Sequence, residues 1–245
     1  MSASEPASEL PTGQLPDSVT SWSEVEQLSP VWLNLGARQN HHPVAGYEGY
    51  VGVDLEPIGD GWTVQHDLRT PLPLPDGTVD RILTEDFVEH IPADFIADLL
   101  AECHRVLRPG GTMRIACPDY NNPKDRYAFD GHPHDSRNDL HITRTDRFMM
   151  ERLLFASPFT DYRFVQYWDG DRFVRGELDD SLGPVKRCPD HDPRCRRAGW
   201  SARTRGVLAD AKYVVTHPTS FRVGEFMSRP GKAWHVTSLV VDITR

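Results

Sequence analysis

Acidic residues follow two apolar runs in the first third of the sequence. Asp54 ends one run, and Asp67 comes after the next. A carboxylate at Asp54 can accept both hydroxyl protons of a ribose, and one at Asp67 can accept from the exocyclic amine of adenine. Leu55 and Leu68 follow the two acids, and Leu68 offers a backbone contact and an apolar wall. These residues together predict a site for adenosine.

A glycine follows the first apolar run. Gly36 comes directly after residues 31–35 and is followed by Ala37 and Arg38. A strand that ends in a glycine turn presents backbone N–H groups at the carboxyl edge of a parallel sheet, where polar cofactor groups bind. Glycine also lets the chain turn sharply against such a ligand. One glycine turn is a weak signal alone, and the acids that follow it in order make it specific.

Short apolar runs bounded by turn residues predict the strands that position these groups. The predicted strands cover residues 31–35, 50–54, 64–66, 79–84, 112–117, 162–168 and 238–244. Apolar residues at helical spacing predict a helix that begins at Pro92 and ends at Gly110. A second helix is predicted over residues 143–155, capped by Thr143 or Thr145. Its apolar face would contain Phe148, Met149, Leu153 and Leu154. This alternation predicts an α/β fold with a parallel sheet.

The predicted domain occupies residues 21–245. Residues 1–20 are rich in Ser, Pro and Glu and predict a disordered tail. Residues 170–230 are rich in Gly, Pro and Arg without sustained periodicity, and this stretch is too long for an ordinary connection. We expect it to be a lid or substrate-binding insertion, with a surface loop as the alternative.

Composition limits the classes of function. The chain has 245 residues, of which 38% are hydrophobic and 26% charged, and a net charge of -9. One globular domain fits this composition, whereas wholesale nucleic-acid binding would need clustered positive charge. No apolar stretch is long enough to span a membrane, and the sequence starts without a secretion signal, so we expect a cytoplasmic protein. Four cysteines are too few for a disulfide scaffold, and Cys103 and Cys117 are expected to be inert core thiols.

Four segments resemble the successive motifs of class I S-adenosylmethionine-dependent methyltransferases. They read LNLGAR, VGVDLEP, HDLRTPLPLPDGTVDRILTEDFVEHI and ECHRVLRPGGTMRIACPD, and they lie within residues 31–119. The terminal SLVVDITR resembles the last, antiparallel strand of the family. The resemblance implies a Rossmann-like, seven-stranded, mostly parallel sheet and S-adenosyl-L-methionine as the cofactor. The cofactor-binding residues that it implies are Gly36, Ala37, Arg38, Asp54, Leu55, Asp67, Leu68, Thr84 and Glu85.

The turn after the first strand departs from the family pattern. The family usually has Gly-x-Gly there, whereas Ala37 and Arg38 follow Gly36. A guanidinium group matches a carboxylate well, so Arg38 could bind the carboxylate of the cofactor. The alternative is that Arg38 points to solvent.

Histidines after the fifth strand are candidates for a general base. Methyl transfer from a sulfonium mainly needs an acceptor held close with water excluded, and a hydroxyl or amine acceptor can also need a base. The stretch GHPHDSRNDLH offers His132, His134, Asp135 and His141, of which His141 and Asp135 precede the second helix. The alternative is a polar loop. Glu89 and His90 resemble a pair common in the family, whose implied role is to orient the helix start.

The insertion contains a Cys/His loop and a basic tract. Cys188, His191 and Cys195 are zinc-ligand types, but the loop has no Cys-x-x-Cys pair and no obvious fourth ligand, so no metal is assigned. Arginine and lysine residues between positions 186 and 205 would attract an acidic small molecule, such as a carboxylate, a phosphate or a sugar nucleotide.

These observations predict a methyltransferase that acts on an O or N atom of a small molecule, in specialised metabolism. One alternative is an enzyme that attacks the aminocarboxypropyl carbon of the cofactor and releases methylthioadenosine. Another is a cofactor-binding interaction protein without catalysis. A nucleic-acid partner is disfavoured, no membrane partner is expected, and the sequence leaves the oligomeric state open.

Overall fold

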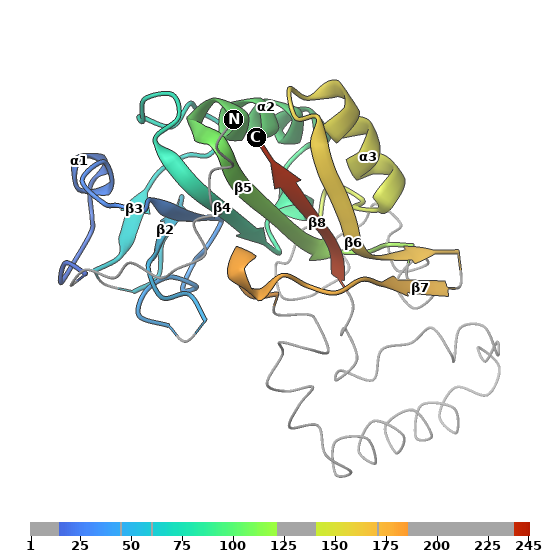
Figure 1. The fold of residues 1–245 in the computed structure, drawn as a ribbon, viewed down its shortest axis with the longest axis horizontal. Helices are drawn as coiled ribbons and strands as arrows, with labels where there is room; N and C mark the ends of the chain where they lie inside the picture. The colour runs from blue at the N-terminus through green and yellow to red at the C-terminus, as the bar shows by residue number, and fades with distance from the viewer. Residues whose placement is uncertain (1–14, 45, 60, 122–140, 171, 186–237) are drawn as a thin grey trace, which may run out of the picture.

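The computed structural model describes residues 15–44, 46–59, 61–121, 141–170, 172–185 and 238–245. Eight strands form one sheet in the order β3-β2-β1-β4-β5-β8-β6-β7. The strands are β1 (Trp32–Leu35), β2 (Tyr50–Asp54), β3 (Thr63–Gln65), β4 (Val79–Glu85), β5 (Leu107–Pro118), β6 (Asp161–Asp169), β7 (Arg172–Arg175) and β8 (Ser238–Thr244). The helices are α1 (Trp22–Val25), η1 (Val88–His90), α2 (Ala93–Val106), α3 (Arg147–Ala156) and η2 (Asp180–Leu182). Figure 1 shows the central sheet with these elements around it.

The sheet confirms the expected Rossmann-like arrangement. The first five strands pair in parallel, and β8 runs antiparallel between β5 and β6. The seven predicted strands are all present, and β7 is an eighth that lies within the predicted insertion. The central strands β1 and β4 are buried along most of their length because other elements cover both faces of the sheet. Their sequences are therefore nearly continuous apolar runs.

Helices α2 and α3 cover one face of the sheet and form the main core with it (Figure 1). The buried side chains of α2 recur at helical spacing, as the sequence predicted. Their strand partners in this core include Leu33, Ile82, Ile115 and Val241. Cys103 and Cys117 are buried here, and burial raises the pKa of both thiols, so they are core residues.

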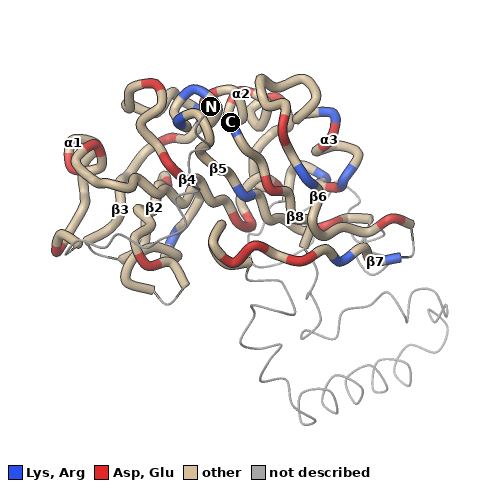
Figure 2. Tube along the Cα trace, in the orientation of Figure 1, with Lys and Arg blue, Asp and Glu red and all other residues tan. Residues whose placement is uncertain are grey.

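An extended segment, residues 176–185, covers the other face of the sheet. Val185 packs against Ala116, Val165 and Val240, and Arg114 donates a 2.7 Å hydrogen bond from Nη1 to the carbonyl oxygen of Gly183. The first part of the predicted insertion is therefore built into the domain. Figure 2 colours the acidic positions along this segment red, and the segment contains Glu177, Asp179 and Asp180. The predicted basic tract and the loop with Cys188, His191 and Cys195 lie outside the described residues.

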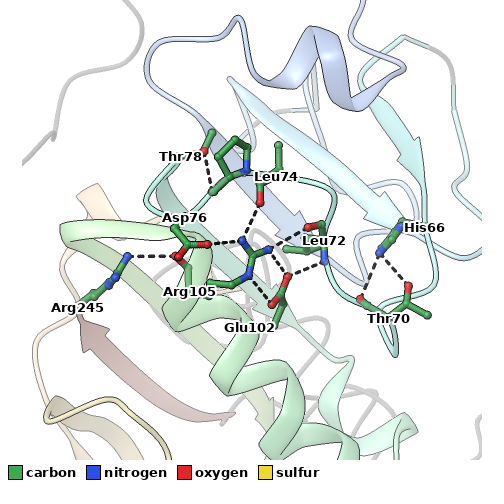
Figure 3. A network of polar contacts seen from close by, with 10 residues as sticks. His66, Thr70, Leu72, Leu74, Asp76, Thr78, Glu102, Arg105 and Arg245 are labelled. Carbon is green, nitrogen blue, oxygen red and sulfur yellow. Dashed lines mark hydrogen bonds and ion pairs between the residues drawn. The ribbon is translucent and has the colours of Figure 1, made fainter.

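One arginine fixes the irregular segment between β3 and β4 against α2 (Figure 3). Arg105 donates to the carbonyl oxygens of Leu72 and Leu74 at 3.0 and 2.8 Å. It also pairs with Glu102 and Asp76 at 2.6 and 2.7 Å. These contacts give hydrogen-bond partners to backbone carbonyl groups of an irregular segment, which has no secondary-structure partners of its own.

Four details of the sequence predictions need correction. Val19, which the prediction placed in a disordered tail, belongs to the fold, because it is fully buried and donates from its N–H to the oxygen of Gly61. Helix α2 ends at Val106, and β5 begins immediately with Leu107. Asp146 caps α3 by accepting from the N–H of Met149, whereas the hydroxyls of Thr143 and Thr145 donate to Ile91 and Pro118. Phe148 is 60% exposed, because the buried face of α3 is formed by Met149, Met150 and Leu154.

None of the helices in the part of the chain that the structure describes is both long enough and apolar enough to cross a membrane.

Candidate functional site

The register of the parallel strands brings the predicted cofactor residues to one edge of the sheet. Leu35 at the end of β1 pairs with Val53 of β2 and with Thr84 of β4. The residues that follow these pairs are Gly36, Asp54 and Glu85. Carboxyl ends of parallel strands share an edge, so three separate sequence motifs meet there.

Gly36 makes the turn at this edge. Its φ angle is 70°, in the left-handed region, and its N–H donates to the oxygen of Val53 at 2.8 Å. A Cβ atom at this position would overlap the ring of Phe87, which packs directly on the glycine. Both the backbone angle and this close approach require glycine. Glycine at this position therefore lets the turn pack against Phe87 at the edge of the sheet.

Asp54 holds the turn from the neighbouring strand. Its Oδ2 accepts from the N–H of Arg38 at 3.0 Å, and its Oδ1 accepts from the N–H of Glu56 at 3.0 Å. Arg38 has a φ angle of 47°, and its side chain is exposed. A carboxylate has about four lone-pair sites. Two backbone bonds therefore leave the partly exposed Asp54 with acceptor capacity for ligand hydroxyls.

Asp67 forms an ion pair beside the same edge. Its carboxylate receives Nε and Nη2 of Arg69 at 2.8 and 2.6 Å. The hydrogen bonds from Arg69 lower the pKa of Asp67 to about 2, so it is an anion at neutral pH. Leu55 beside Asp54 is 53% exposed, and Leu68 is partly buried. The surface at the predicted adenine position therefore carries the ionised carboxylate of Asp67 together with the apolar side chains of Leu55 and Leu68.

The end of β4 is more deeply buried than the other two positions. Glu85 is 6% exposed and accepts a hydrogen bond from the hydroxyl of Tyr47. Burial and the negative charge of Glu85 raise the pKa of Tyr47 well above its ordinary value, so the phenol stays protonated and donates. The hydroxyl oxygen of Thr84 is buried with no hydrogen-bond partner among the described residues. The strand then turns at Asp86, whose φ angle is 49°.

A second group of polar side chains lies after β4 and β5, and we name it the histidine cluster: Glu89, His90, Tyr120 and His141. The hydroxyl of Tyr120 is hydrogen-bonded to Nδ1 of His141. Nε2 of His141 lies 4.0 Å from Oε1 of the fully buried Glu89, and Nε2 of His90 lies 3.8 Å from the same oxygen. Of the four predicted catalytic residues, the structure describes His141; His132, His134 and Asp135 lie outside the described residues.

The site contains residues that the sequence reasoning did not assign to it. Tyr47 and Tyr120 were not singled out, and Glu89 and His90 were expected only to orient a helix start. Glu89 and His90 follow β4 closely in the sequence, and this position at the carboxyl edge could have indicated that they belong to the site. Tyr47 lies in an irregular loop, so no sequence pattern indicated that it belongs to the site.

The glycine turn at the carboxyl edge of the sheet and the acceptor capacity of Asp54 fit a nucleoside cofactor. Phe87 fills the space on the Cβ side of Gly36, and the carboxylate of Asp54 contacts the same turn from the neighbouring strand, where it keeps acceptor sites for ligand hydroxyls. The histidine cluster offers a carboxylate and imidazoles, which can take part in proton transfer or hold a metal ion.

The sequence is similar to known methyltransferases over part of its length. Residues 43–115 match the family model described as Methyltransferase domain. A 56-residue stretch is 38% identical to a probable S-adenosylmethionine-dependent methyltransferase of Mycolicibacterium smegmatis, and it covers 23% of this chain and 21% of that protein. The match therefore spans about a fifth of the relative's length.

One similar solved structure is a SAM-dependent methyltransferase from Archaeoglobus fulgidus. The two structures have a TM-score of 0.49 and 15% sequence identity, and the match covers 87% of this chain and 85% of the other. A second is an S-adenosylmethionine-dependent methyltransferase from Mesorhizobium loti, with a TM-score of 0.47 and 16% identity over 87% and 90% of the two chains.

Proposed function

We propose that this chain, which is similar to S-adenosylmethionine-dependent methyltransferases over part of its length, transfers a methyl group to an oxygen or nitrogen atom of a small molecule. The observation that carries the proposal is the common edge formed by the Gly36 turn and Asp54, with Asp67 beside it. We propose that this methylation is a step of specialised metabolism.

The proposal assigns a role to each residue of the cofactor edge. Asp54 accepts from the ribose hydroxyls, Asp67 accepts from the adenine amine, and Leu55 and Leu68 flank the base. The bound cofactor supplies a methyl group already activated on a sulfonium. Residues at the methionine end would be Gly36, Ala37, Arg38, Thr84 and Glu85. Arg38 is the proposed partner of the carboxylate, since its side chain is exposed and its backbone is fixed by Asp54.

The acceptor would lie beside the histidine cluster. His141 follows the fifth parallel strand in the sequence and approaches Glu89, which follows the fourth. We propose His141 as the described residue that acts on the acceptor, with Tyr120 fixing the orientation of its ring. His132, His134 and Asp135 remain predictions for the same role. An acidic acceptor would be drawn by the basic tract between positions 186 and 205.

A product assay tests this function. Purified protein is incubated with S-adenosylmethionine and sets of small hydroxyl and amine acceptors, and both nucleoside products are quantified by chromatography. We expect S-adenosylhomocysteine in amounts that depend on one acceptor class. Acceptor-dependent methylthioadenosine would instead indicate attack on the aminocarboxypropyl carbon. Cofactor binding without either product would favour a non-catalytic binding protein.

A further inference from the structure

The histidine cluster contains three groups that converge on one point. Glu89 and His90 belong to η1, and His141 precedes α3. One ligand atom from each of these residues lies within 4.8 Å of the other two. A carboxylate with two imidazoles is a donor set for first-row divalent metals, and zinc sites of this type leave a coordination position open.

The separations between these atoms suit an ion better than direct hydrogen bonds. Oε1 of Glu89 lies 3.8 Å from Nε2 of His90 and 4.0 Å from Nε2 of His141. Both distances exceed the range of a hydrogen bond. An ion with bonds of about 2.0–2.2 Å to nitrogen and oxygen would bridge them after the side chains close in by roughly an ångström.

Backbone hydrogen bonds join the two segments that carry the ligands. The carbonyl oxygen of Glu89 accepts from the N–H groups of Ile142 and Thr143 at 2.9 and 3.0 Å. The hydroxyl of Thr143 donates to the oxygen of Ile91 at 2.5 Å. Each of these bonds lies within two residues of a ligand. The three ligands are therefore held on a shared frame and need only side-chain adjustments to bind.

The orientation of His141 also matches that of a metal ligand. Its Nδ1 is bonded to the hydroxyl of Tyr120, so its Nε2 is the nitrogen that faces Glu89. A histidine that binds a metal through one nitrogen commonly has the other fixed by an outer partner of this kind. The ring of His90 stands nearly perpendicular to that of His141, at 87° and 4.8 Å between centroids, so the two rings reach the same point from different directions.

We propose that Glu89, His90 and His141 bind one divalent transition metal ion, of which zinc is the ion tested. The proposed role of the ion rests on the proposed function: an acceptor hydroxyl bound at the open position would be held near the methyl group and would lose its proton more readily to solvent water, so that the oxygen could take the methyl group as the carbon–sulfur bond of the sulfonium breaks. In this arrangement His141 acts on the acceptor through the ion. The binding itself does not depend on the reaction.

Zinc titration of the full-length protein tests the site. The protein is stripped of metal with a chelator and titrated with Zn²⁺ by calorimetry, and Co²⁺ absorption spectra report the ligand environment. We expect one ion per chain in the wild type, and at least tenfold weaker binding in H90A and H141A. His104 on α2 contacts Phe159 outside the cluster, so H104A should bind zinc as the wild type does.

A double variant, C188S with C195S, separates this site from the cysteines of the insertion. It should retain the zinc ion and the Co²⁺ spectrum. Unchanged zinc affinity in both H90A and H141A, or loss of zinc only in the cysteine variant, would overturn the proposal. Thermal unfolding of each variant shows whether it folds, and E89Q supplies a third ligand variant if one of the others does not.

Binding of S-adenosylhomocysteine to the metal-free protein separates this inference from the proposed function. We expect cofactor affinity in H90A to stay within twofold of the wild type. Normal cofactor binding and product formation in protein that binds no zinc would overturn the metal site alone. Zinc binding without any binding of the cofactor would contradict the proposed function and leave the metal site in place.

Discussion

An Asp54→Ala variant is expected to bind S-adenosylhomocysteine about 100-fold more weakly than the wild type. The change removes the acceptor proposed for the ribose hydroxyls, and hydrogen bonds to a charged group contribute about 1.5–3 kcal/mol each. It also releases the N–H groups of Arg38 and Glu56, each held at 3.0 Å, and so loosens the turn beside the ligand. A 100-fold loss corresponds to about 2.7 kcal/mol of binding free energy. Isothermal titration calorimetry measures it.

Asp80 provides a matched control at the opposite edge of the sheet. Its carboxylate also holds backbone, accepting from the N–H of Val31 at 2.8 Å, and it pairs with Arg108 at 2.5 Å. Asp80→Ala should lower the free energy of unfolding while leaving the cofactor affinity within twofold. Equal loss of affinity in the two variants would mean that Asp54 acts only through stability.

Replacing Arg114 with methionine should lower the free energy of unfolding by about 3–5 kcal/mol. Arg114 is fully buried in β5 and forms two hydrogen bonds with Asp242 of β8, at 2.7 and 2.9 Å. Its third contact, with the oxygen of Gly183, anchors the segment that covers this face of the sheet. Removing the guanidinium leaves the buried carboxylate without its charged partner. Chemical denaturation followed by circular dichroism measures the loss.

The double variant R114M with D242L tests the cause of that loss. Apolar residues of similar volume can replace a buried ion pair at little cost, because neither charge is then left in the interior. We expect the double variant to be more stable than R114M alone. A double variant as unstable as R114M would show that the pair itself is not the source of the effect.

The sequence predicted the strands and α2 because their patterns follow from burial. A strand covered on both faces must be apolar throughout, and a helix on one face must repeat its apolar residues at helical spacing. The start of α3 was missed for a local reason. Thr143, Thr145 and Asp146 are all good caps, and the choice depends on Ile91 and Pro118, whose carbonyl oxygens bind the two threonine hydroxyls. Residues so far apart in the sequence become neighbours only through the fold.

The residues of the candidate site likewise fall into those that the sequence predicted and those that it did not. Gly36, Asp54 and Asp67 follow strands directly, so the order of strands predicts their common edge. Tyr47 reaches Glu85 from an irregular loop, and Tyr120 reaches His141 across residues outside the described part of the chain. No periodicity or spacing encodes such contacts. The segment 176–185 was equally hidden, since irregular backbone that covers a sheet face has no amphipathic pattern of its own.

A crystal structure of the protein with S-adenosylhomocysteine tests the central claim most directly. It should contain the ribose hydroxyls within hydrogen-bond distance of the Asp54 carboxylate, with the nucleoside beside the Gly36 turn and the sulfur directed toward His141. Ligand density at another edge of the sheet, or a ribose out of reach of Asp54, would contradict the account.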